Sequence, residues 1–200
     1  GEIFIGCAGG RDTQAYFAYH REDVEDKHIA YKLTVGGLKG GHSGDDINKG
    51  LGNANKILNR FLWNGERKFA LRLSVIDGGN LRNAIAREAY AIVTIPLKHQ
   101  ADWEAFVASL SKDIRAELAT TDPGLTIELS ETAKPDFRID AICQENLLNA
   151  LYACPHGVMA MSADIPGLVE TSTNLASVKM SETEINISTS QRSSIESARQ

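Results

Sequence analysis

The 200-residue sequence has few cysteines and no excess of basic charge. Three cysteines, Cys7, Cys143 and Cys154, are too sparse for a disulfide framework and favour a reducing, cytoplasmic compartment. Lys and Arg total 21 against 26 Asp and Glu, and the resulting net charge of −5 argues against a general nucleic-acid binder. Apolar runs stay well below the roughly 20 residues of a membrane span. We therefore expect no nucleic-acid and no membrane partner.

The sequence also lacks a recognisable metal-binding pattern. Its five histidines are scattered, without a His-x-x-x-His pair that would place two ligands on one helix face. Cys154-Pro155-His156 is a lone match with no second pair, so a loop histidine near a buried thiol is the better interpretation. We expect no metal site within this chain.

Hydrophobic periodicity predicts regular elements in most of the chain. Apolar residues that alternate along the chain predict strands, and apolar residues spaced as in Trp103, Phe106, Val107 and Leu110 predict helices. The predicted order is strand, helix, strand, strand, helix, strand, over residues 29–35, 47–62, 69–75, 89–95, 103–118 and 125–129. This order predicts an α+β ferredoxin-like sandwich, in which helices cover one face of an antiparallel sheet.

Two further elements extend the basic sandwich. A third helix is predicted over residues 141–153, ending before Pro155, and a β-hairpin over residues 171–180 and 183–190. At the ends, Glu2–Ile5 has a strand-like composition, and Ser193–Ala198 has the serines and acid of a helix start. Both ends suggest a domain excised from a longer protein.

The glycine-rich segment Gly36–Gly44 is the most informative part of the sequence. Five glycines among nine residues suit a backbone that turns sharply or lies close to a ligand. The segment joins a strand to a helix and contains His42 among small residues, so it is either a plain turn or a ligand-facing loop with His42 as donor. Gly50 and Gly52 fall in the first turns of the predicted helix, where they indicate either a close backbone approach or a frayed helix start.

Two other polar residues are candidates for ligand contact. Asn83 lies between two predicted strands, where asparagine is usually a turn residue. Arg192 follows the last predicted strand. Its guanidinium is either a solvated surface charge or a bidentate partner for a carboxylate.

Several segments together resemble a known enzyme family. Residues 35–44, Val-Gly-Gly-Leu-Lys-Gly-Gly-His-Ser-Gly, and residues 50–56, Gly-Leu-Gly-Asn-Ala-Asn-Lys, resemble the aminoacyl-histidine (Xaa-His) dipeptidases. These belong to the di-zinc metallopeptidase family of carboxypeptidase G and carnosinase. Residues 5–10, 83–89 and 192–194 match further segments in the same order, except that Ala86 stands where relatives often carry proline.

The resemblance implies a lid or dimerisation domain, inserted into a catalytic domain that holds two zinc ions. It implies residues 1–26 as a connecting segment, 27–190 as the lid and 191–200 as the return to the catalytic domain. It further implies a homodimeric cytoplasmic dipeptidase in which His42 stabilises the oxyanion while Asn83 and Arg192 bind the substrate carboxylate. On this basis the segment alone, without metal ligands, is expected to be inactive.

One alternative of another class remains open, a self-contained ferredoxin-like module that binds a small acid and regulates a partner. The parent reading frame distinguishes the two. An upstream His-x-Asp segment and a late histidine downstream favour the enzyme, and stop codons at both ends favour the module.

Overall fold

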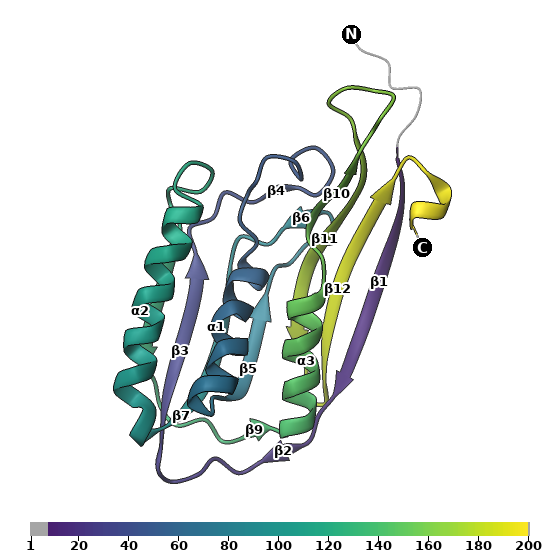
Figure 1. The fold of residues 1–200 in the computed structure, drawn as a ribbon. Coiled ribbons are helices and arrows are strands. Elements are labelled where there is room, and N and C mark those ends of the chain that lie inside the picture. The colour runs from purple at the N-terminus through teal and green to yellow at the C-terminus, as the bar shows by residue number, and fades with distance from the viewer. Residues whose placement is uncertain (1–7, 200) are drawn as a thin grey trace.

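A computed structural model describes residues 8–199 of the chain. Its centre is a four-stranded antiparallel sheet in the order β5-β7-β3-β8, with two connecting helices (Figure 1). The elements are β3 (His28–Gly36), α1 (Ala54–Phe69), β5 (Arg72–Gly78), β7 (Ala89–Pro96), α2 (Gln100–Glu117) and β8 (Thr126–Glu131). This connectivity is that of a ferredoxin-like sandwich, so the predicted fold class is confirmed.

The sheet continues beyond β5 through the C-terminal hairpin. β11 (Val169–Met180) pairs with β12 (Glu184–Ser193), which is the predicted hairpin, and β11 also pairs with β5, which was not predicted. Two further strands of this sheet were not predicted: β10 (Gly157–Met161), which pairs with β11, and β1 (Gly9–Ala18), which pairs with β12 along its whole length. Ten residues of the expected connecting segment are thus an edge strand of the same sheet.

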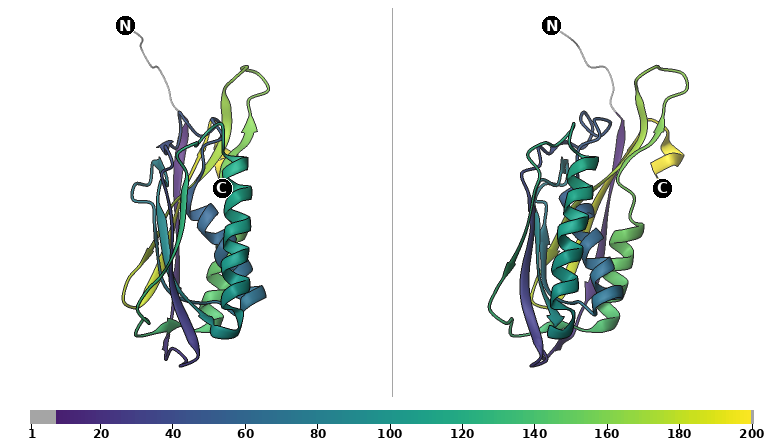
Figure 2. Two further views of the ribbon diagram at one scale, coloured as in Figure 1. Left: turned by 90° about the vertical axis from the view of Figure 1, so that its left-hand side faces the viewer. Right: turned by 60° about the vertical axis from the view of Figure 1, so that its left-hand side comes forward.

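Three helices, α1, α2 and α3 (Ala141–Ala153), cover one face of the sheet (Figure 2). The core lies between them and the sheet, where Phe61 of α1 and Trp103 of α2 are fully buried. Short elements complete the chain: β2 (Arg21–Glu22), β4 (Gly41–His42), β6 (Ala84–Ile85), η1 (Leu97–His99), β9 (Arg138–Ile139) and η2 (Glu196–Arg199). None of the helices within residues 8–199 is both long and apolar enough to span a bilayer.

The first helix differs from its predicted bounds at both ends. It begins at Ala54 rather than Ile47, because Gly50 adopts a left-handed φ of 67° and the Asn53 side chain caps the N–H groups of Asn55 and Lys56. Gly50 and Gly52 therefore precede the helix.

α1 also extends beyond the predicted end at residue 62, to Phe69. A Cβ on Gly65 would lie 2.6 Å from a methyl of Leu71 and 2.9 Å from the Trp103 ring, so this glycine lets the helix pack closely.

The structure tests only one of the two elements expected at the chain ends. The expected strand at 2–5 lies outside the described residues. The expected helix start at Ser193 is instead the end of β12, followed by the short 3-10 helix η2. β1 begins and β12 ends beside each other, at the end of the sheet that carries β4 and β6 (Figure 1).

Candidate functional site

The glycine-rich segment, residues 36–44, runs from the end of β3 through the short strand β4 into a turn at residues 43–45. β4 pairs with β6, which places His42 opposite Ala84. The N–H of Ser43 donates to the carbonyl oxygen of Asn83 at 2.9 Å. The structure therefore brings two of the predicted site residues, His42 and Asn83, to adjacent backbone positions.

The imidazole of His42 is oriented by its own turn. Its Nδ1 faces the backbone N–H groups of Gly44 and Asp45, at 3.2 and 3.3 Å. Because two donors face Nδ1, the neutral ring carries its proton on Nε2. The Asp45 carboxylate is 3.5 Å from Nδ1 and 89% exposed, so it is a looser partner than the two amides. With 40% of the side chain exposed, Nε2–H is available to donate to a ligand.

Asp46, which the sequence analysis missed, holds this turn. Its Oδ2 accepts from the N–H of His42 at 2.7 Å, and its Oδ1 accepts from Nζ of Lys49 at 2.5 Å. The Lys49 ammonium and then the His42 N–H lower the pKa of Asp46, so the carboxylate stays charged. A Cβ on Gly41 would lie 2.7 Å from Cβ of Asp46, which explains the glycine before His42. In the sequence, the spacing of four residues between His42 and Asp46 was the feature that could have indicated this contact.

Arg192 reaches the same turn from β12. Its Nη1 lies 2.9 Å from the position that a Cβ on Gly44 would take, and Cε1 of the His42 ring lies 3.3 Å from that position. Arg192 and Gly44 line an open cavity of about 320 Å³ with Ser172 and Glu170. Within residues 8–199, no hydrogen bond or ion pair engages the guanidinium. A half-buried cation beside an imidazole donor can bind a carboxylate.

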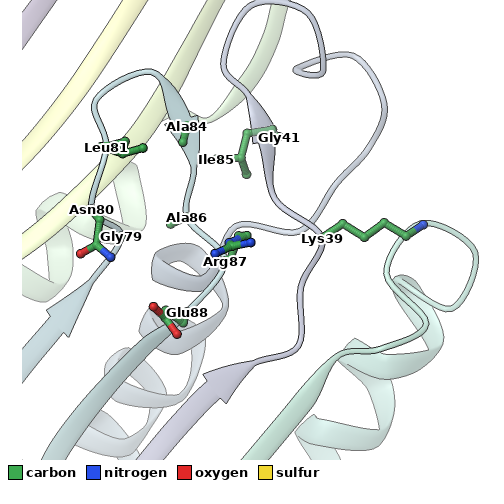
Figure 3. A pocket seen from close by; sticks show the side chains of 10 residues that line it. All are labelled: Lys39, Gly41, Gly79, Asn80, Leu81, Ala84, Ile85, Ala86, Arg87 and Glu88. Carbon is green, nitrogen blue, oxygen red and sulfur yellow. The ribbon is translucent and has the colours of Figure 1, made fainter.

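Asn83 joins this group through its backbone, while its side chain is exposed. A second cavity, of about 300 Å³, is lined in part by Gly41 of β4 and by Ala84 and Ile85 of β6 (Figure 3). There the Lys39 side chain extends away from the other labelled residues, and the charged side chains of Arg87 and Glu88 are exposed. This cavity includes none of the three predicted residues, so the candidate site is the one around Gly44.

Ala86, the position where relatives often carry proline, is buried beside the site. Its carbonyl oxygen accepts from the N–H of Ala54 at 2.9 Å, which ties the segment after β6 to the start of α1. This hydrogen bond also satisfies one of the free N–H groups at the start of α1.

The contacts of Cys154 and His156 indicate a structural role for both residues. The Nδ1 of His156 faces the N–H of Leu175 and Nδ2 of Asn53, both at 3.3 Å. Burial, together with the Lys56 charge, lowers the pKa of His156 to about 4. Burial raises the pKa of the Cys154 thiol. Among residues 8–199 no group of three or more His, Cys, Asp or Glu side chains could hold a metal ion.

The domain is thus an α+β sandwich built on an antiparallel sheet. One end of the sheet carries the His42 donor and the Arg192 guanidinium, which has no partner within residues 8–199. Residues 27–122 match the family model described as the peptidase dimerisation domain. The chain is 38% identical, over 199 residues, to the cytosol non-specific dipeptidase of Escherichia coli strain K12. The crystal structure of aminoacylhistidine dipeptidase from Vibrio alginolyticus superposes with a TM-score of 0.94 at 37% identity, over 98% of this chain.

Residues 27–122 thus match the peptidase dimerisation domain family model, and the resemblance seen in the sequence is confirmed. The chain spans 41% of the length of the Escherichia coli relative and 40% of the Vibrio chain.

Proposed function

We propose that this chain is the lid and dimerisation domain of a zinc-dependent, cytosolic dipeptidase of the Xaa-His type that works as a homodimer. The carrying observation is that the His42 imidazole and the Arg192 guanidinium, which has no partner among the described residues, both lie beside Gly44. The names of the relatives, a cytosol non-specific dipeptidase and an aminoacylhistidine dipeptidase, supply the substrate class.

His42 and Arg192 have complementary tasks in this proposal. Peptide hydrolysis places negative charge on the former carbonyl oxygen, and a fixed donor at that point stabilises the transition state. Nε2–H of His42 is such a donor, since Nδ1 is already occupied by two amides. Arg192 binds the free carboxylate of the dipeptide, and the exposed amide of Asn83 donates to the same group.

Residues 8–199 include no group of three or more side chains that could hold a metal ion, so we propose that the zinc ions of the enzyme are held outside this part of the protein. Bound zinc polarises the scissile carbonyl and supplies hydroxide near neutral pH. The part of the protein described here contributes binding and charge stabilisation only.

Residues 27–190 are proposed as the lid, with residues 1–26 and 191–200 as its connections to the catalytic domain. The pairing of β1 with β12 supports a pair of connections that leave the lid together, because Gly9 lies opposite Ser193. The start of β1 and the end of β12 therefore both lie at the end of the sheet that carries the site, where Gly10 is opposite Arg192.

The test is His42→Ala in the full-length parent enzyme. Loss of one oxyanion donor should lower kcat by about 10²–10³-fold, while the metal content measured by atomic emission stays at the wild-type level. The 200-residue chain alone should cleave no dipeptide when zinc, manganese or cobalt is added. Unchanged kcat in the variant, or turnover by the isolated chain, would contradict the proposal.

A further inference from the structure

A buried asparagine on β11 holds the segment that carries Asn83. Asn174 is 1% exposed, and its Nδ2 donates to the carbonyl oxygen of Ala84 at 2.9 Å. A weaker contact from the same nitrogen reaches the carbonyl oxygen of Arg82 at 3.4 Å. One amide group thus contacts the backbone on both sides of Asn83.

The segment around Asn83 has few other connections to the main sheet. Ala84 donates to Leu81 within its own loop, and Arg82 forms an ion pair with Asp12 whose two side chains are 76% and 36% exposed. An ion pair this exposed contributes little to rigidity. Asn174 therefore supplies the buried polar contact between this segment and β11.

Through the backbone of Asn83, Asn174 also influences the position of the turn that carries His42. The carbonyl oxygen of Asn83 accepts the N–H of Ser43, the residue that follows His42. Ser43 is 2% exposed, so this hydrogen bond is shielded from water. A shift of the 82–84 backbone would therefore move the Asn83 side chain directly and the His42 turn through Ser43.

Burying Asn174 has a cost that packing alone does not explain. No partner within the described residues satisfies its Oδ1, although this atom is buried. An unsatisfied buried acceptor is unfavourable, and an apolar residue would avoid it. An amide at this buried position is explained by its N–H groups, which fix the backbone of a candidate substrate-binding loop.

We infer that Asn174 is a positioning residue, which holds Asn83 for the substrate carboxylate and steadies the His42 turn. The inference rests on the proposed dipeptidase function. It adds a residue that touches neither the substrate nor the reacting atoms and acts through the backbone of residues 82–84.

Asn59 on α1 provides a matched control. It is 2% exposed, its Nδ2 donates to the carbonyl oxygen of Leu148 at 3.1 Å, and its Oδ1 is likewise buried without a partner among the described residues. Asn59 lies between α1 and α3, away from the loops that carry the site. Replacing either asparagine with alanine should therefore have similar consequences for stability.

The experiment compares Asn174→Ala with Asn59→Ala in the full-length parent enzyme. Asn174→Ala should raise KM for a free dipeptide by about tenfold, with a smaller change in kcat, and should affect an amidated dipeptide little. Asn59→Ala should leave both constants near wild type. In an Asn83→Ala background, Asn174→Ala should raise KM less than twofold, because its target is already absent.

The outcomes separate this inference from the proposed function. If Asn83→Ala raises KM but Asn174→Ala changes KM no more than Asn59→Ala, the positioning role is wrong and the dipeptidase site stands. If Asn83→Ala itself has no effect on KM, the proposed site fails first. Should Asn174→Ala fail to fold, Asn174→Leu removes both N–H donors while filling the buried space, and wild-type KM in that variant would also overturn the positioning role.

Discussion

The guanidinium of Arg192 occupies the space that a side chain on Gly44 would need, with Nη1 2.9 Å from the position of the missing Cβ. These residues come from opposite ends of the chain, from the turn after β4 and from β12. Gly44 therefore does more than permit a turn. It admits a charged group from another strand to the side of His42.

Gly44→Ala should displace Arg192 without unfolding the domain. The backbone at Gly44 is not left-handed, and the contact is with the far end of a flexible side chain. The free energy of unfolding should change by less than about 0.5 kcal/mol, while KM of the parent enzyme for a free dipeptide should rise several-fold.

Gly37→Ala is the contrasting variant. Gly37 has φ of 70°, and a Cβ there would lie 2.0 Å from the carbonyl oxygen of Gly124. We expect a loss of about 2–4 kcal/mol in the free energy of unfolding. Thermal and urea unfolding of the two variants measure the difference. Equal destabilisation by both changes would show that Gly44 is needed for the fold, and not chiefly to admit the Arg192 side chain.

Arg192→Ala in the parent enzyme should mainly raise KM for free dipeptides, because the deleted guanidinium contacts a carboxylate present before and during the reaction. An amidated dipeptide lacks that group, so the same substitution should alter its kinetics little. Arg82→Ala, which removes an exposed arginine paired with Asp12, is the control and should behave as wild type. Equal losses for both substrates would assign Arg192 a structural role.

Whether His42 serves its own subunit or the partner is decided by mixing subunits. A His42→Ala parent enzyme is combined with one inactivated in its catalytic domain, and the subunits are allowed to exchange. If His42 acts across the dimer, random reassortment of equal amounts restores about a quarter of wild-type activity, since half of the dimers then contain one complete site. Absence of recovery after proven exchange would assign His42 to its own subunit.

His156 should make the stability of the domain depend on pH. Its pKa is lowered to about 4 in the folded chain, so between pH 6.5 and about 4 the unfolded chain binds a proton that the folded chain does not. The free energy of unfolding should therefore fall as the pH is lowered through this window, by about 2–3 kcal/mol.

His156→Gln should flatten that part of the stability profile. His20→Gln, at an exposed position, should retain the wild-type slope. Urea unfolding at a series of pH values measures both variants. A slope in His156→Gln as steep as in wild type would show that other groups cause the pH dependence.

Local patterns in the sequence were sufficient to predict the ferredoxin-like core. Alternating or helically spaced apolar residues mark β3, α1, β5, β7, α2 and β8, because each of these elements buries one face against the other layer. The helix over residues 141–153 was predicted with the same bounds as α3. The predicted bounds of α1 were wrong at both ends. Ile47 is buried although it lies in a turn before the helix, and Gly65 lies within the helix, where it allows close packing against Leu71 and Trp103.

The edge strands β1 and β10 could not be predicted in this way. Most of the side chains of β1 are exposed, as in its polar stretch Arg11–Gln14, so no alternation marks it. β1 exists because its backbone pairs with β12, and that pairing is a long-range contact. Backbone hydrogen bonding to a distant strand leaves little trace in local composition.

The sequence determined by itself which residue types were available for chemistry: an unshielded histidine in a glycine-rich turn, and an arginine at the end of the last strand. Only the tertiary structure decided that His42 and Arg192 meet around Gly44, and that Asp46 and Asn174 hold the loops beside them. The reason is physical. Periodicity reports which face of an element is buried, whereas a site between loops depends on the register in which distant strands pair.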